Sequence, residues 1–213
     1  MPPMSENGHE QEEQEKAATH AEDSRDMAGL AAGKDVALDA LMGRHGERLL
    51  HFLIRIVRDQ DEAADLAQET FARVYRHRAS FRQGAKFTTW LFSIATNLAL
   101  NRLRYVERHP VTSMEAEPAP GATPLGETLP AGNLTPFEEL AQRERAALIQ
   151  EGLAALPIEL RTPLILAEYE DLSYAEIAEV EACTEKAIEM RLYRARAALR
   201  AWLTSRGVRV RET

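Results

Sequence analysis

The side chains of this sequence that could catalyse a reaction or hold a metal are six histidines, one cysteine and 34 carboxylates, and their spacing suits neither task. Cys183 stands alone, and the histidines show none of the short spacings that metal sites use. The acids between Asp61 and Glu69 sit among apolar helix positions, without a second acid cluster to complete a metal site. No nucleophile stands beside a base. We therefore expect no enzyme, no metal and no cofactor, and we interpret Cys183 as a buried or turn-lining thiol rather than a redox sensor.

A basic segment near the C-terminus indicates binding to DNA rather than catalysis. Residues 186–211 hold eight basic side chains and a single acid, Glu189. Lysine and arginine neutralise phosphates and read base edges. The formal net charge of −8 hides this segment, because the acids lie elsewhere. The net charges are −6 for residues 1–36, +4 for 37–104, −3 for 105–136 and −3 for 137–213.

The elements around the basic segment predict a helix-turn-helix. Ser173 and Glu176 have the spacing of a capping box, which starts a short helix. A turn at 182–184 follows, and Thr184 can cap the next helix. One side of that second helix is apolar and carries Ile188, Leu192, Ala195, Leu199, Trp202 and Leu203. In DNA-binding proteins this arrangement places the second helix, the recognition helix, in the major groove. The alternative interpretation is that the basic residues form a solvated face on an ordinary bundle helix.

The rest of the chain is predicted to form helices and connecting segments, because it contains no run with the alternating pattern of a strand. Residues 1–36 are polar and acid-rich, which predicts a disordered tail. Six prolines in the segment 107–136 predict a flexible linker. The expected fold is all-α, with two small helical domains at 37–106 and 137–213, the second a helix-turn-helix. Before the helix pair we expect helices at about 37–57, 62–77, 88–105, 136–155 and 157–168.

The same features predict where the protein resides and how it moves. No apolar run approaches the roughly 20 residues of a membrane helix, and the first residues lack the order of a secretory signal. We expect a cytoplasmic protein without membrane insertion. Two small cores on a long linker, with no evident shared apolar face, predict domains that move independently in the free protein.

Four runs of sequence resemble the extracytoplasmic-function (ECF) group of bacterial sigma factors, which keeps regions 2 and 4 of the larger sigma family. The runs are DEAADLAQETF at 61–71 and FRQGAKFTTWLFSIATNLALNR at 81–102 for region 2, and DLSYAEIA at 171–178 and RLYRAR at 191–196 for region 4. The resemblance covers about residues 39–203. It implies an alternative sigma factor that binds core RNA polymerase and promoter DNA, with an anti-sigma factor as a further partner. A decoy for an anti-sigma factor and a plain helix-turn-helix regulator are the alternatives.

The resemblance also implies three sets of binding residues. Core polymerase is expected to bind Asp61, Asp65, Gln68, Glu69 and Phe71, a group of polar side chains beside an aromatic taken to be exposed. The minus-ten element, with an unstacked base near loop aromatics, is expected to bind Phe81, Lys86, Phe87, Asn97, Asn101 and Arg102. The minus-thirty-five element is expected to bind Lys186, Glu189, Met190, Tyr193, Arg194 and Arg196.

Two positions depart from the pattern of the group. Glu189 stands where a basic residue is common, and an acid there repels phosphate but can accept a hydrogen bond from a cytosine amino group. Ala182 stands where glycine is common in the turn, which costs roughly 1 kcal/mol if the backbone has positive φ. We expect an unusual promoter preference, and either a strained turn or a different one.

Overall fold

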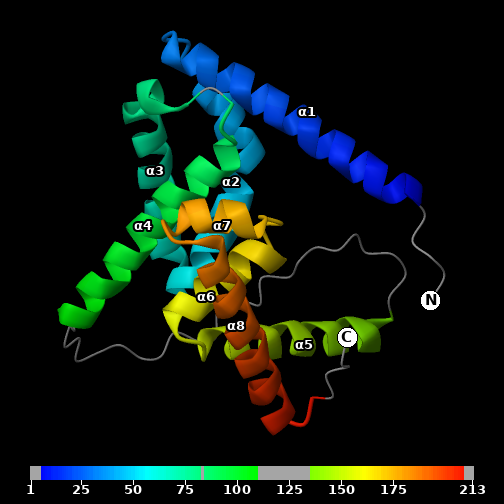
Figure 1. Ribbon diagram of the computed structural model, residues 1–213. Coiled ribbons are helices and arrows are strands. Elements are labelled where there is room, and N and C mark those ends of the chain that lie inside the picture. The colour runs from blue at the N-terminus through cyan, green and yellow to red at the C-terminus, as the bar shows by residue number, and fades with distance from the viewer. Residues whose placement is uncertain (1–5, 83, 110–134, 209–213) are drawn as a thin grey trace.

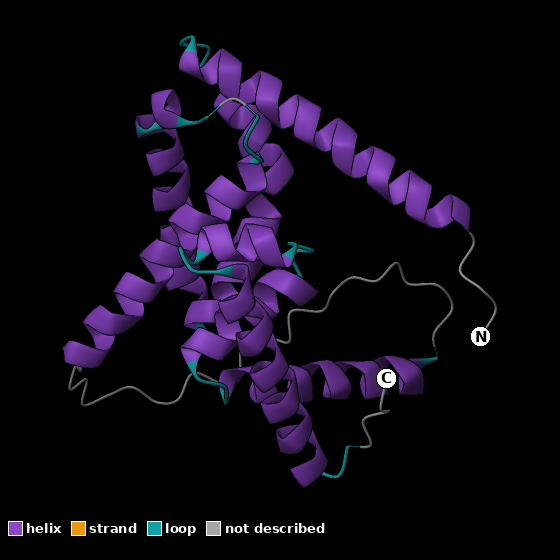
Figure 2. Ribbon diagram, viewed as in Figure 1, coloured by secondary structure: helices purple, strands orange, loops and turns teal. Residues whose placement is uncertain are grey.

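The computed structural model describes residues 6–82, 84–109 and 135–208, and these contain helices and loops but no strand (Figure 1, Figure 2). The all-α class is confirmed. We call α1–α4 the N-terminal bundle and α5–α8 the C-terminal bundle. The helices are α1 (Glu6–Ala31), α2 (Val36–Val57), α3 (Gln60–Arg76), the 3-10 helix η1 (Arg78–Ser80), α4 (Phe87–Arg108), α5 (Pro136–Ala154), α6 (Ile158–Glu168), α7 (Tyr174–Val180) and α8 (Glu185–Ser205).

Side-chain caps fix the starts of three of these helices. The Asp59 carboxylate accepts the backbone N–H of Glu62 at 2.8 Å, so α3 begins two residues earlier than its apolar pattern predicts. Ser173 and Glu176 form the predicted capping box at the start of α7. The Thr184 hydroxyl caps α8 in a similar way. Local capping chemistry therefore sets the boundaries that the helix-turn-helix needs.

The disordered tail expected for residues 1–36 is wrong for the stretch that forms α1. Met27 and Leu30 are buried as α1 packs along α2. Asp23 is 2% exposed, accepts a hydrogen bond from Arg44 at 2.5 Å and lies 2.8 Å from the His45 ring nitrogen. These buried residues all lie in the second half of α1, while its first half extends away from α2 (Figure 1). Two buried apolar residues are too few to give a periodic signal.

Both bundles have closely packed interiors. In the N-terminal bundle, Phe52 of α2 meets Phe92 of α4 edge to face, with ring centroids 5.0 Å apart. In the C-terminal bundle, α8 buries Ile188 among its neighbours. A Cβ added at Gly152 of α5 would lie 2.6 Å from Cδ1 of Leu199 and 3.0 Å from Cε3 of Trp202, so glycine at this position lets the two α8 side chains pack directly against α5.

The expectation that the two domains share no apolar face is wrong for this arrangement. α6 packs against α2 and α7 packs against α4, and the buried apolar residues of both bundles form one continuous core (Figure 1). Polar contacts join the bundles as well. Nε of Arg48 lies 2.6 Å from the Glu170 carboxylate, and Nζ of Lys86 lies 2.8 Å from that of Glu176.

Most of the predicted linker lies outside the described residues. α4 continues to Arg108, two residues past the predicted domain boundary, and α5 begins at Pro136. The bundles are thus placed side by side by the contacts between their own helices.

Candidate functional site

The exposed side of α8 carries most of the residues predicted to face DNA. Lys186, Glu189 and Arg194 are exposed, while Met190 and Tyr193 keep 42% and 71% of their surface. The opposite side of the helix is buried. Met190 and Tyr193 are exposed to solvent on a helix that buries Ile188, Leu192 and Ala195 on its other side, so they are available to a partner.

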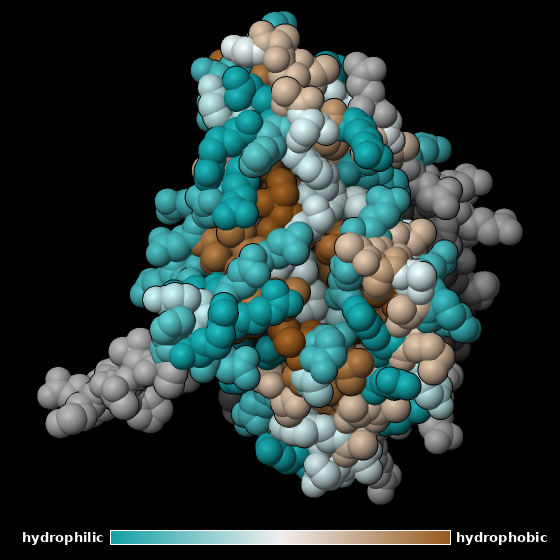
Figure 3. Space-filling model, turned by 60° about the vertical axis from the view of Figure 1, so that its left-hand side comes forward, coloured by the Kyte–Doolittle hydropathy of each residue, from teal (hydrophilic) through white to brown (hydrophobic). Residues whose placement is uncertain are grey.

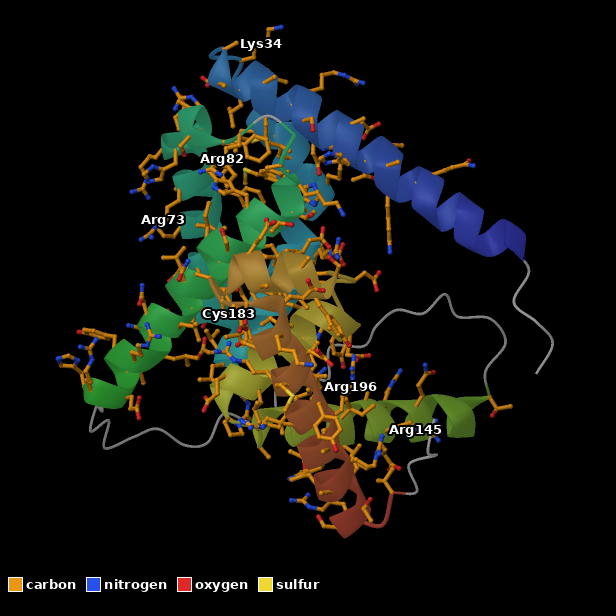
Figure 4. All side chains as sticks on the ribbon, in the orientation of Figure 1. Lys34, Arg73, Arg82, Arg145, Cys183 and Arg196 are labelled. Atoms are coloured by element: carbon orange, nitrogen blue, oxygen red, sulfur yellow. The ribbon has the colours of Figure 1, made fainter. Side chains whose placement is uncertain are left out.

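Three of the charged residues predicted to face DNA, Lys186, Glu189 and Arg196, already have partners inside the protein. Nζ of Lys186 lies 2.7 Å from the Glu189 carboxylate, a solvent-exposed pair of little energetic weight. Arg196, labelled on α8 in Figure 4, donates to the Tyr174 hydroxyl and to Glu168, and these hydrogen bonds raise the pKa of its guanidinium. Arg194 has no such partner among the described residues. Arg194 is therefore the more accessible of the two arginines.

The turn before α8 is strained at the position where the sequence suggested strain. Ala182 has φ +50, in the left-handed region that costs a residue with a Cβ roughly 1 kcal/mol. The alternative expectation, a turn of different geometry that avoids positive φ at Ala182, is therefore wrong.

Ala182→Gly is expected to stabilise the protein by about 1 kcal/mol, because glycine accepts this φ without a steric cost and the exposed methyl group makes no packing contribution. The midpoint of urea unfolding measures the change. An unchanged or lower midpoint would show that the greater freedom of glycine in the unfolded chain outweighs the relief.

A second surface includes the loop before α4 and one face of α4. Phe81 is half-buried with its ring centroid 5.2 Å from that of Trp90. Asn97 is exposed, and its Nδ2 donates to the Ser93 carbonyl at 2.9 Å. Asn101 is exposed too. This face offers amide groups and one partly open aromatic cluster.

Three of the predicted minus-ten residues are engaged within the protein. Phe87 is 1% exposed, so the prediction that it can stack on a base is wrong: it begins α4 and its ring belongs to the core. Nζ of Lys86 is paired with Glu176, and Arg102 lies 2.7 Å from Glu62. The loop aromatic accessible to a base is Phe81.

The exposed edge of α3 carries the polar residues predicted to bind the polymerase. Asp61, Asp65 and Gln68 are exposed. Glu69 accepts hydrogen bonds from Arg73 and Arg76, which lower the pKa of its carboxyl group. Arg73 projects from α3 in Figure 4. This edge is an acidic strip with its own arginines beside it.

The prediction that Phe71 is an exposed aromatic on α3 is wrong, because its side chain is 4% exposed and packs in the core. Thr70, the residue before it, is also buried, so both side chains belong to the inward face of α3. On the face drawn in Figure 3, hydrophilic side chains predominate and the most strongly apolar patches lie recessed between them.

Sequence reasoning missed the charged contacts between the bundles. Arg48 and Glu170 are 122 positions apart, and neither belongs to a motif that singles it out. The guanidinium of Arg55 lies 4.0 Å from the centroid of the Tyr169 ring, a second such contact. Within the described residues no cluster of histidine, cysteine or carboxylate side chains could hold a metal, and no helix is long and apolar enough to span a membrane.

Comparison with protein families gives two matches, which together cover over half of the chain. Residues 41–109 match the model described as Sigma-70 region 2, and residues 146–199 match Sigma-70, region 4. The RNA polymerase sigma-H factor of Pseudomonas aeruginosa is 34% identical over 185 residues, 85% of this chain and 93% of that protein. The ECF RNA polymerase sigma factor SigW of Bacillus subtilis is 32% identical, over 80% and 91% of the two chains.

Solved structures show the same fold. CnrH in complex with the cytosolic domain of CnrY has a TM-score of 0.64 at 24% identity, covering 86% of this chain and 98% of that one. The sigma factor RpoE in complex with the anti-sigma factor NepR from Bartonella quintana has a TM-score of 0.61 at 22% identity, covering 78% and 96%.

Proposed function

Because this chain belongs to the ECF group of RNA polymerase sigma factors, with regions 2 and 4, we propose which of its surfaces bind the polymerase and the promoter. The chain is an alternative sigma factor: it binds core RNA polymerase and directs promoter recognition, DNA melting and transcription initiation. We assign the N-terminal bundle to region 2 and the C-terminal bundle to region 4, with the linker between them.

Region 4 reads the minus-thirty-five element through the exposed side of α8. The observation that carries this proposal is the capped helix-turn-helix whose longer helix exposes Arg194, Met190 and Tyr193 and buries its other side. Arg194 suits a phosphate or a guanine, and the apolar pair suits thymine methyl groups. Lys186 and Glu189 lie at the start of the same helix. Arg196 takes part once it releases Glu168.

Region 2 captures the minus-ten element on the face that carries Phe81, Asn97 and Asn101. A flipped base needs hydrogen-bonding groups and a surface to stack on, and exposed amides beside the Phe81–Trp90 cluster supply both. Arg102 and Lys86 contribute phosphate contacts after leaving their carboxylate partners.

Core polymerase binds the exposed edge of α3. Asp61, Asp65 and Gln68 are free to contact a basic partner, and Glu69 is held ionised by its arginine neighbours. The chemistry belongs to the polymerase, so the sigma factor itself acts as a binding protein in the cytoplasm. An anti-sigma factor is a further partner, supported by the similar fold of the sigma factor RpoE, which was solved in complex with the anti-sigma factor NepR.

The test is transcription with purified components. The chain plus core polymerase should start transcripts from the promoter upstream of its own coding sequence, while the polymerase alone should not. A variant with alanine at Asp61, Asp65 and Gln68 should fold normally and lose core binding. Absence of transcripts with the natural chain at every promoter tested would contradict the assignment.

Arg194→Ala and Glu189→Ala are expected to change DNA binding in opposite ways. Loss of Arg194 should weaken binding to all sequences about equally and lower the salt slope by about one unit. Loss of Glu189 removes a repelling charge, so non-specific DNA should bind better. The Glu189→Ala variant should bind the protein's own promoter no better than the natural chain does, because a preferred base loses a hydrogen-bond acceptor worth about 1–3 kcal/mol. Fluorescence anisotropy against salt measures both. If Glu189→Ala tightened every complex by the same factor, the residue would have no part in base readout.

A further inference from the structure

The helix α1 lies before residues 41–109, the part of the chain that matches region 2, yet it packs against the elements around the minus-ten loop. Besides α2, α1 contacts η1 and α4, which flank the loop 81–86. The C-terminal part of α1 and this loop lie at the same end of the N-terminal bundle (Figure 1). α1 therefore contacts both the element before the loop and the element after it.

One buried carboxylate joins α1 to α2. Asp23 is 2% exposed, and its Oδ1 lies 2.8 Å from Nε2 of His45, which is 4% exposed. The same oxygen accepts a hydrogen bond from Arg44 at 2.5 Å. Because a carboxylate paired with an arginine only accepts hydrogen bonds, Nε2 of His45 has to carry a proton and donate it. This hydrogen bond fixes the orientation of the imidazole ring.

The His45 ring also meets the aromatic cluster of the minus-ten loop. Its centroid lies 5.2 Å from that of Phe87, the first residue of α4. The centroid of Phe87 in turn lies 6.3 Å from that of Phe81 and 6.4 Å from that of Trp90. A continuous series of contacts thus runs from Asp23 of α1 to Phe81 in the loop.

The two ends of this series differ in exposure. Asp23, His45 and Phe87 are buried, while Phe81 is half-buried and accessible to a base. A shift of the His45 ring would be passed on to Phe87, because closely packed side chains leave no void to absorb it. A ring that stacks on a base binds best when packed neighbours hold it in place beforehand, since a loose ring has to be ordered at the moment of binding.

The attachment of α1 to Arg44 does not explain why Asp23 is buried. Arg44 also contacts two other carboxylates of α1, Asp26 at 2.9 Å and Glu22 at 3.4 Å. These two carboxylates are more exposed than Asp23 and already join the arginine to α1. What Asp23 adds to them is the hydrogen bond to His45.

We propose that Asp23 and His45 are positioning residues of the minus-ten site. α1 orients the His45 ring through Asp23, and that ring holds the loop aromatics in the position that accepts an unpaired base. Both side chains are buried, so they act through Phe87 and Phe81 and do not themselves touch DNA. The proposal rests on the function assigned above to the face of α4 beside this loop.

The fluorescence of Trp90 tests the contact between α1 and the loop without polymerase or DNA. The chain has two tryptophans, so in a Trp202→Phe background the emission comes from Trp90 alone. His45→Gln keeps a donor for Asp23 and removes the ring that meets Phe87. This variant should shift the emission to longer wavelength and raise the acrylamide quenching constant. The control is His51→Gln, the same change at a half-buried position of α2, which should alter neither.

Promoter opening with core polymerase measures the functional consequence. Asp23→Asn keeps the size of the side chain and removes the charged acceptor, and it should reduce opening about tenfold, within the range of coupling in one contact network. The affinity for core polymerase should stay unchanged, because the exposed edge of α3 is not altered. Asp26→Asn, which changes a carboxylate on the same arginine, is the control and should open normally. Circular dichroism verifies folding, and His45→Gln gives the same test if Asp23→Asn does not fold.

A double-mutant cycle separates positioning from a general loss of stability. If Asp23 acts through the Phe81 ring, Asp23→Asn should have no further effect on opening once Phe81→Ala has removed the ring that it positions. A general weakening of region 2 would instead multiply the two losses. The cycle is measured with permanganate on the same promoter for all four proteins.

The outcomes distinguish this proposal from the assigned function. The proposal is overturned if Trp90 is unaffected by His45→Gln, or if Phe81→Ala reduces opening while Asp23→Asn and His45→Gln do not. Losses that multiply in the cycle overturn it as well. If Phe81→Ala and Asn97→Ala both leave opening unchanged, the assignment of the minus-ten face is wrong, whatever the fluorescence of Trp90 shows.

Discussion

Asp23→Ala is expected to destabilise region 2 by about 3 kcal/mol, the largest effect on stability that we predict. The carboxylate is 2% exposed and contacts Arg44 and the buried His45. Its removal leaves the His45 ring nitrogen without a partner in the core. The loss also weakens the attachment of α1 to α2, since the other buried residues among the described side chains of α1 are Met27 and Leu30. The midpoint of urea unfolding measures the change.

Asp26→Ala is the matched control. Asp26 lies three residues further along α1 and binds the same arginine, Nη2 of Arg44 at 2.9 Å, but it is only half-buried and has no buried histidine beside it. A loss below about 1 kcal/mol is expected there. Equal small losses for both variants would show that α1 is not part of the stable fold of region 2.

Asn97→Ala is expected to reduce promoter opening about tenfold or more while leaving the affinity for core polymerase nearly unchanged. The side chain is exposed, and its one hydrogen bond within the protein goes back to the Ser93 carbonyl on the same helix, so its removal should not disturb the fold. Loss of a hydrogen bond that leaves a polar group of the unpaired base without a partner costs about 1–3 kcal/mol. Permanganate reactivity of the melted strand measures opening, and competition for core polymerase measures binding.

A promoter with a pre-opened minus-ten bubble provides the control for this prediction. If Asn97 holds an unpaired base, the variant should bind the pre-opened template less tightly too, because the contact is lost even when melting costs nothing. Asn101→Ala, one turn further along α4, should have a smaller effect, since Asn101 lies farther from the Phe81 loop. A comparable loss of core affinity for Asn97→Ala would show that Asn97 has a structural role instead.

Much of the fold could be predicted because it depends on local signals. The capping box at Ser173 and Glu176, the cap at Thr184 and the apolar stripe of α8 are relations between residues a few positions apart, and all of them occur in the structure. The strain at Ala182 was one of the two outcomes expected there, because glycine is common at this turn position in the family. The helices of region 2 lie within a few residues of their predicted bounds for the same reason.

The candidate site was predicted less completely, since exposure depends on packing. Phe71 and Phe87 lie in motifs typical of the family, and the sequence says nothing of how deeply each ring is covered. The exposure of Met190 and Tyr193, by contrast, could be predicted, because both residues lie opposite the buried apolar stripe of α8. Periodicity identifies the centre of an apolar face reliably and its edges poorly.

The sequence alone determined the helical class, the helix-turn-helix and the likeness to ECF sigma factors, because each is expressed in short runs of neighbouring residues. Only the tertiary structure decided that α1 is anchored through Asp23, that two motif aromatics are core residues, and that Arg48 meets Glu170 across 122 positions. Contacts of that kind depend on which helix faces come together and how much water they exclude. No local pattern encodes the cost of burying one carboxylate against one arginine.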